Sequence, residues 1–343
     1  MPRLIPLVLF AACGGSGAAS HDAPSASDAP LADGTRSDTP VADAPALPTY
    51  SAMPTQTLVR PANAGNAYGV VAAISADGKT LVTFDVSALY VFMRANTTDA
   101  FPTTPAQTIQ PSGVSTIGVG LSLSADGALL ACGAIATGGA LEVLVFARQG
   151  SDYGTTPQVL PATSGYSEVA VSALSPDASE LAVDTSAGDL AILPRSGSTF
   201  SSTPSLTIPR PTGASSFFPM AAGLSATGTT LAIGDSGVMG GGGVFVYTGG
   251  TTPSQTLTPI SGESDFGTAV AVRSDAGELV VGSIGGPGQV GVFQHGSTGY
   301  TRVQTIAPPT GAVGDFAVSV SLAADGTLVV TDYGAHIYIF APT

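Results

Sequence analysis

The sequence predicts an all-β fold: a six-bladed β-propeller with four-stranded antiparallel blades. Three observations predict it. The 343 residues include 44 glycines and 26 prolines, which disfavour long helices. After residue 53, a turn of the form Ser-x-Asp-Gly-x-x-Leu returns at intervals of about 50 residues. Four short apolar runs accompany each copy of the turn, and this combination is typical of propeller blades, whose period is roughly 40–50 residues.

The turn gives the period of the repeat. Its glycine position recurs six times, at intervals of 49, 51, 50, 49 and 49 residues. The six positions are Gly78, Gly127, Ala178, Gly228, Gly277 and Gly326. A second segment, of the form Gln-Thr-hydrophobic, keeps the same period. Two features that share one period over six copies indicate an internal repeat.

The strands of one repeat are designated A to D in chain order. In the fifth repeat, strand A is the apolar run 266–272 before the turn, strand B is 278–282 after it, and strand C is 289–293. Strand D is the Gln-Thr-hydrophobic segment, which is 304–306 in this repeat. The runs of strands A, B and C alternate or are continuously apolar, as expected for half-buried or buried strands.

The two ends of the repeated region predict how the ring closes. The region starts with a D strand, 55–59, and stops after a C strand, 337–340. We therefore expect the first strand to complete the last blade, which would leave no sheet edge open for aggregation. The predicted propeller domain is 54–343.

The first 53 residues predict a secretion signal and a tether. Residues 1–12 hold one basic side chain and a short apolar run, as in a signal peptide, and the run is too short to span a bilayer. The segment from Phe10 to Cys13 resembles the bacterial lipoprotein signal, which implies lipidation of Cys13 and an extracytoplasmic, lipid-anchored protein of the cell envelope, we expect at the outer membrane. The alternative is an ordinary secretion signal with a chance cysteine. Residues 13–53, rich in Asp, Ala and Pro, predict a disordered tether.

A pair of residues ahead of each turn carries a family resemblance. The pairs are Tyr68-Gly69, Ile117-Gly118, Glu168-Val169, Phe218-Pro219, Phe266-Gly267 and Phe316-Ala317. Together with B strands such as LAIGD and LVVGS, they resemble the FG-GAP repeat of integrin-α-like propellers in its bacterial form. The resemblance covers 54–343 and is weakest in repeat three. It implies a binding module, with the aromatic residue packed between blades and the glycine allowing close approach of the backbone.

Two features depart from that family. Its rings usually have seven blades, whereas this chain has six repeats. Many members also carry an Asp-x-Asp-x-Asp-Gly calcium loop, but each A–B turn of this chain contains at most one aspartate. Calcium requires six to eight oxygen ligands, so we expect no calcium site of the family type, no other metal and no cofactor.

The net charge of −14 disfavours binding to nucleic acid, because the acidic chain would repel phosphates. A protein or glycan partner at the cell surface is expected instead, with the lipid anchor in the membrane and the protein itself a monomer. Cys132 lies in an apolar strand and is expected to be a buried, unreactive thiol. His295 and His336, next to C strands, are expected to be surface loop residues.

Three carboxylates follow B strands at the same register: Asp85, Asp235 and Asp332. The topology places these strand ends on one face of the ring, where the loops joining strand D to the next strand A also emerge. The hypothesis is that this face binds a ligand or cation through the three carboxylates. The alternative is that they are solvated loop residues, repeated only by the symmetry of the blades.

The function predicted from these features is a lipid-anchored binding or structural module at the bacterial cell surface, without catalytic residues. The alternative is a propeller enzyme of the lactonase or hydrolase type, with carboxylates at the central channel. The A strands line such a channel, and they consist mostly of Val, Ala, Ser and Leu. This composition argues against the enzyme.

Overall fold

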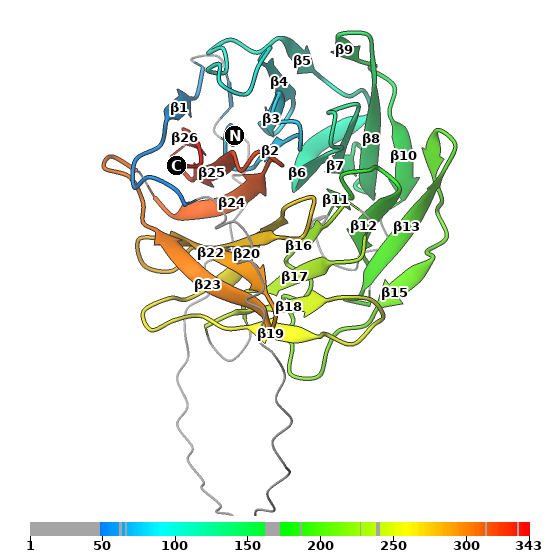
Figure 1. Ribbon diagram of the computed structural model, residues 1–343. Coiled ribbons are helices and arrows are strands. Elements are labelled where there is room, and N and C mark those ends of the chain that lie inside the picture. Colours follow the sequence, from blue (N-terminus) through cyan, green and yellow to red (C-terminus); the bar gives the residue numbers. More distant parts are fainter. Residues whose placement is uncertain are drawn as a thin grey trace, which may run out of the picture. The chain divides into compact units, whose positions relative to one another are not determined.

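The computed structural model describes residues 49–343 except 62–63, 66, 162–171, 186, 227, 238–240, 313 and 335. It confirms the predicted all-β, six-bladed propeller, with six separate antiparallel sheets that follow one another around a ring (Figure 1). The predicted signal peptide, Cys13, most of the tether and the pair Glu168-Val169 lie outside the described residues. The described residues contain no helix that is long and apolar enough to cross a membrane.

Each blade has four principal strands, which run in chain order from A to D. Blade one consists of β2 (Ala72–Ile74), β3 (Thr80–Phe84), β4 (Leu89–Met93) and β5 (Gln107–Ile109). Blade two consists of β6 (Val114–Leu123), β7 (Leu129–Ala136), β8 (Leu141–Gln149) and β10 (Gln158–Pro161), with β9 (Asp152–Tyr153) paired to β8. Blade three consists of β11 (Ser172–Leu174), β12 (Glu180–Asp184), β13 (Leu190–Ser196) and β15 (Leu206–Ile208), with β14 (Thr199–Phe200) paired to β13.

The second half of the chain repeats the pattern. Blade four consists of β16 (Ala221–Leu224), β17 (Leu231–Asp235), β18 (Gly243–Tyr247) and β19 (Gln255–Leu257). Blade five consists of β20 (Phe266–Val272), β21 (Glu278–Ser283), β22 (Gln289–Gly296) and β23 (Gly299–Ile306). Blade six takes strands A to C from the C-terminus and strand D from the N-terminus: β24 (Phe316–Leu322), β25 (Leu328–Asp332), β26 (His336–Phe340) and β1 (Gln56–Val59).

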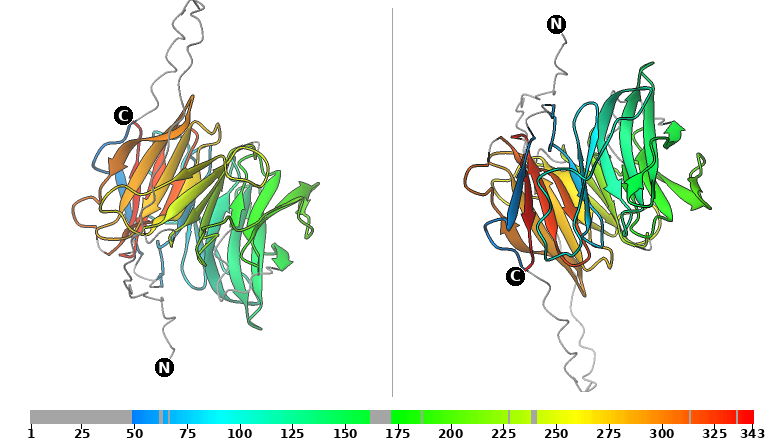
Figure 2. Two further views of the ribbon diagram at one scale, coloured as in Figure 1. Left: turned by 90° about the horizontal axis from the view of Figure 1, so that it is seen from below. Right: turned by 90° about the horizontal axis from the view of Figure 1, so that it is seen from above.

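Strand β1 closes the ring, as predicted. It pairs antiparallel with β26, from Gln56 opposite Ile339 to Val59 opposite His336. Figures 1 and 2 show the blue strand beside the red one, although they come from opposite ends of the chain. The pairing extends beyond β1, because Tyr50 forms a bridge with Pro342. Residues 49 and 50, which the sequence pattern assigns to the tether, therefore contact the last blade.

The core is divided into six layers, one at each junction between neighbouring blades. Each layer is a separate cluster of buried side chains contributed by two adjacent blades. The first residue of each FG-GAP-like pair lies in these layers, as predicted. In the five described pairs, this residue is at most 2% exposed: Tyr68, Ile117, Phe218, Phe266 and Phe316. The A strands of all neighbouring blades contact one another and form the inner wall. Cys132 is buried as predicted, and burial raises the pKa of its thiol to about 12.

The A–B turns are tied by their own side chains. In blade one, Ser75 Oγ donates to Asp77 Oδ1 at 2.5 Å, and the same carboxylate oxygen accepts from the Lys79 N–H at 3.0 Å. The residue after the aspartate takes a positive φ, which glycine adopts without strain. In blade five that residue is Ala276, with φ 60°, and not the predicted marker Gly277. Phe266 therefore lies ten residues before its turn, like its counterparts in the other described repeats.

A second repeated device joins the blades at their outer edge. The glutamine of strand D exchanges two hydrogen bonds, of 2.6–2.9 Å, with the backbone of a buried aromatic residue in the next blade. We call this pair the clasp. The five clasps are Gln56–Phe101, Gln107–Tyr153, Gln158–Phe200, Gln255–Tyr300 and Gln304–Tyr50. The junction between blades three and four has none, because Leu206 takes the place of the glutamine.

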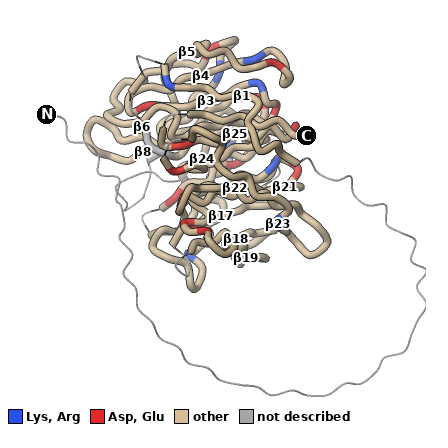
Figure 3. Tube along the Cα trace, turned by 90° about the vertical axis from the view of Figure 1, so that its left-hand side faces the viewer, with Lys and Arg blue, Asp and Glu red and all other residues tan. Residues whose placement is uncertain are grey.

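Charged residues are sparse along the chain, as the few blue and red segments of the tube in Figure 3 show. One ion pair is buried at the junction of blades five and six, where Arg273 and Glu278 are 6% and 0% exposed. The hydroxyl of Tyr50 donates to Glu278 at 2.8 Å. The N-terminal clasp thus also supplies a hydrogen bond to a buried carboxylate.

Replacing Tyr50 by Ala is expected to lower the free energy of unfolding by roughly 3–5 kcal/mol, because it empties a buried aromatic position and removes a donor from Glu278. Urea denaturation of the full chain measures this. Tyr50→Phe should lie between Tyr50→Ala and wild type, since it keeps the ring and loses only the hydroxyl. Ser51→Ala, at an exposed position, serves as the control. Equal stability of Tyr50→Ala and Ser51→Ala would show that this segment does not hold the last blade.

Candidate functional site

The candidate site is the face of the ring that carries the B–C turns and the D–A loops. Asp85, Asp235 and Asp332 lie at this face, as predicted, but they are 4%, 0% and 0% exposed. The interpretation as solvated loop carboxylates is therefore wrong. A buried carboxylate requires hydrogen-bond donors, and the neighbouring loops provide them.

Asp85 joins a B–C turn to a D–A loop. Its Oδ2 accepts from the Gly65 N–H at 2.8 Å and from the Tyr90 hydroxyl at 2.7 Å. Its Oδ1 accepts from the N–H groups of Ser87 and Ala88 at 2.8 and 2.9 Å. Burial by itself would raise the pKa of Asp85, but these donors outweigh it and hold the pKa below its usual value. The ionised form therefore stabilises the loop.

Asp235 likewise joins a B–C turn to a D–A loop in blade four. The Ser215 N–H donates to its Oδ2 at 2.6 Å, and the Ser215 hydroxyl donates to Oδ1. The Phe217 N–H donates in turn to Ser215 Oγ at 3.0 Å. The ring of Phe217, in the same loop, remains 38% exposed. A buried carboxylate thus holds the loop that presents an aromatic side chain to solvent.

Asp332 organises the B–C turn of blade six. It accepts from the His336 N–H at 3.0 Å and from the Tyr338 hydroxyl at 2.8 Å. His336 Nδ1 lies 3.0 Å from Oδ2 of the same carboxylate. The prediction that His336 is a surface loop residue was wrong, because it is the first residue of β26 and its side chain is only 25% exposed. His295 is exposed, as predicted, but it lies on a strand and not in a loop, because β22 continues past the predicted end at residue 293.

Ser283 occupies the same register position in blade five, although the sequence pattern did not single it out. Its hydroxyl donates to the carbonyl of Ser264 in the D–A loop at 2.8 Å. That loop is also held by Glu263, whose carboxylate accepts two hydrogen bonds from Arg302 at 2.7 and 2.8 Å. The position directly after strand B could have pointed to Ser283 in the sequence. A serine at that position is less conspicuous than the aspartates of the other blades.

The three aspartates are not brought together. Each lies in its own blade and bonds to the turns and loops beside it, so the face is a set of separate loop anchors. Among the residues that the structure describes, no group of three or more His, Cys, Asp or Glu side chains is arranged to hold a metal ion. A direct role of Asp85, Asp235 and Asp332 in ligand binding stays a prediction. The geometry itself shows that they order loops.

The ordered loops carry exposed apolar side chains. Phe217 and Ile260, in the D–A loops of blades four and five, are 38% and 48% exposed. Val86, in the B–C turn after Asp85, is 39% exposed. We call these three residues the loop-face apolar group. Large apolar side chains at loop tips, on a backbone fixed by buried polar contacts, are suited to binding a partner rather than to acid–base chemistry.

Asp85→Asn is expected to lower the free energy of unfolding by roughly 1–3 kcal/mol at neutral pH, because the amide cannot accept all the donors around it. The folded-state pKa of Asp85 is below the unfolded value, so its contribution is complete above about pH 4 and is lost as the pH falls through the folded pKa. The difference between wild type and Asp85→Asn in urea midpoint should therefore shrink in acid. Asp152→Asn, at an exposed aspartate, is the control. A pH-independent difference would contradict the role of the ionised carboxylate.

Comparison with known proteins supports the fold and nothing finer. No family model matches the chain. No curated protein matches it either. A solved chain from the "Crystal Structure of Mitotic Checkpoint Complex" is similar, with a TM-score of 0.54, 12% sequence identity, and coverage of 91% of this chain and 98% of that chain. At such low identity the similarity supports the propeller architecture alone, because a shared fold does not establish function.

Proposed function

We propose that this protein is a binding module of the bacterial cell envelope, anchored by lipid at Cys13. The loop-face apolar group meets a protein or glycan partner. One observation carries this proposal: buried side chains at one register position, Asp85, Asp235 and Ser283, tie the D–A loops to the B–C turns. Loops fixed before binding lose little conformational entropy when a partner docks, which favours affinity.

Membership of the FG-GAP repeat group is part of the proposal. It is supported by the buried aromatic residue followed by a backbone of positive φ, as at Phe266-Gly267 and Phe316-Ala317, where φ of the second residue is 92° and 69°. A bulge follows each of these pairs in the ladder between strands A and B. The similar solved chain comes from a structure of a multi-protein complex, which is consistent with a protein-binding role for this chain.

The location rests on the N-terminal sequence. An apolar run that ends at Cys13, followed by a polar segment rich in Asp, Ala and Pro, supports export and lipid attachment. Several acyl chains on one residue give stable anchoring where a single chain does not. The scarcity of charged residues, 10% of the chain, is compatible with an extracytoplasmic all-β protein.

The contact face can be tested by affinity capture from surface-labelled cell envelopes with the full chain as bait. Phe217→Ser combined with Ile260→Ser should reduce the recovered partner about tenfold, the effect of losing roughly 1.4 kcal/mol of binding free energy. Val303→Ser is the matched control, because Val303 is 47% exposed but lies on the outer strand β23. Equal recovery by the double variant and the control would exclude the loop-face apolar group as the contact.

The anchor is tested separately. Cys13→Ser is expected to move the protein from the membrane pellet to the soluble fraction of cells and to abolish labelling with a fatty-acid analogue. A control substitution, Cys132→Ser, should leave both unchanged in protein that folds. Membrane retention of the Cys13→Ser protein would contradict lipid anchoring at this residue.

A further inference from the structure

The junction between blades three and four is built differently from the other five. Leu206 stands at the strand-D position that holds a clasp glutamine elsewhere. The connection between β18 and β19, residues 248–254, contains no aromatic residue to be held. It contains Gly249 and Gly250 instead, and a Cβ built on either would meet no atom within 4 Å. Both halves of the clasp are therefore missing at one junction.

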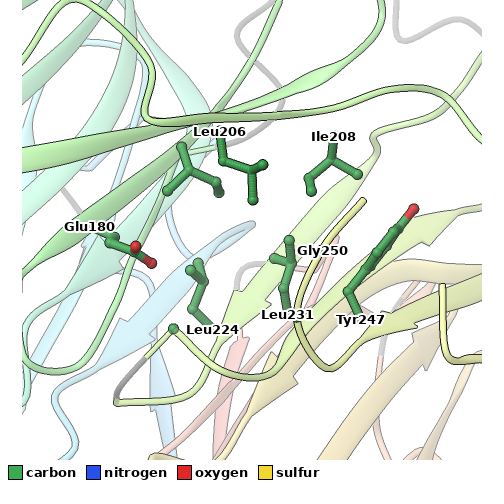
Figure 4. A pocket seen from close by; sticks show the side chains of 10 residues that line it. Glu180, Leu206, Ile208, Leu224, Leu231, Tyr247 and Gly250 are labelled. Carbon is green, nitrogen blue, oxygen red and sulfur yellow. The ribbon is translucent and has the colours of Figure 1, made fainter. Parts of the chain in front are cut away.

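A cavity lies at this junction. It has a volume of about 60 Å³ and an apolar wall of Leu206, Ile208 and Leu231. Figure 4 shows Leu206 and Ile208 on one side, Leu224 and Leu231 on the other, and Glu180 and Tyr247 at opposite ends. The enclosed volume is smaller than the roughly 150 Å³ that holds a benzene molecule. A bound ring would therefore have to extend beyond this volume toward Gly249 and Gly250, which also line the cavity.

The junction between blades five and six shows what fits such a position. There the clasp aromatic is Tyr50, and its hydroxyl donates to Glu278, the first residue of β21. Glu180 is the first residue of β12 and holds the equivalent place in blade three. Tyr50 also arrives from a distant part of the chain, 228 residues from Glu278. A tyrosine carried on a separate segment can therefore fill this kind of position.

Two polar side chains, those of Tyr247 and Glu180, line the cavity. Tyr247 is 2% exposed, and its hydroxyl has no hydrogen-bond partner among the described residues. The carboxylate of Glu180 receives no donor from the part of the chain that the structure describes, and burial, with a smaller effect of Asp177, raises its pKa. Gly228 makes room for this carboxylate, since a Cβ there would lie 2.2 Å from Glu180 Oε2. The carboxylate of Glu180 is only partly buried, and it can accept a hydrogen bond from a ligand that carries a hydroxyl group.

We infer that this cavity is a binding site for a tyrosine side chain on an extended segment of a partner polypeptide. The phenol ring packs against Leu206, Ile208 and Leu231, as the clasp aromatics pack at the other junctions. Its hydroxyl donates to the carboxylate of Glu180, as Tyr50 donates to Glu278. The site lies at the A–B turn end of the blades, away from the loop-face apolar group, so it does not depend on the function proposed above.

Titration of the full chain with N-acetyl-tyrosinamide, followed by saturation-transfer NMR, tests the inference. Saturable binding is expected, stronger than that of N-acetyl-phenylalaninamide by roughly tenfold, because only the phenol can donate to a carboxylate. Glu180→Gln should reduce this preference while both compounds still bind. Leu206→Trp should abolish binding by filling the cavity, whereas Val159→Trp, at an exposed position on strand D of blade two, should not.

The inference would be overturned by three outcomes. One is the absence of saturable binding to wild type. Another is equal binding of the tyrosine and phenylalanine amides, which would leave Glu180 without a role. The third is unchanged binding by Leu206→Trp, which would place the compound elsewhere. If Leu206→Trp does not fold, as judged by its thermal transition, the preference measured with Glu180→Gln decides the question by itself.

Discussion

Every blade of this protein has two apolar faces and cannot bury either of them alone. A single four-stranded sheet would leave one or both faces in water, and the burial of apolar surface is the main driving force for folding. The ring satisfies this constraint by placing each blade between two others, which gives six separate core layers. The ring must also close, and for that reason the pairing of β1 with β26 matters more than its four residues suggest.

With few charged residues available, the fold uses buried polar groups for local order. The A–B turns are held by Ser and Asp side chains that accept and donate within a few residues. At the opposite end, Asp85 and Asp235 are fully engaged by backbone and hydroxyl donors from loops 20 residues away. Because these carboxylates already have donors, they hold the described loop residues Gly65 and Ser215 in the absence of a partner. That property links the electrostatics of the face to its proposed role in binding.

One junction between blades departs from the pattern of the other five. Five junctions carry a glutamine–aromatic clasp, and the sixth has Leu206 and two glycines in its place. A cavity lies at that junction, lined by Glu180 and by Tyr247, whose buried hydroxyl has no hydrogen-bond partner among the described residues. In a protein whose other junctions follow one plan, such a departure is best explained by an external occupant of the same chemistry.

The sequence predicts the number of blades, the order of their strands and the closure of the ring. These features can be read from the linear sequence, because they follow from a repeat period of about 50 residues and from short alternating apolar runs. It also placed Asp85, Asp235 and Asp332 on one face, because strand direction follows from strand order. The position of the left-handed residue in blade five was missed, since the Asp-Ala-Gly sequence allows Ala276 or Gly277 and only the observed bonds distinguish them.

Which polar groups are buried, and what they contact, depends on how the blades pack in three dimensions. Whether Asp85 is solvated depends on Gly65, and whether Glu278 has a donor depends on Tyr50, 228 residues away. The role of Ser283 and the cavity beside Leu206 have the same origin. Such contacts form between segments that ring closure brings together. No local pattern encodes them, because each partner by itself resembles an ordinary loop residue.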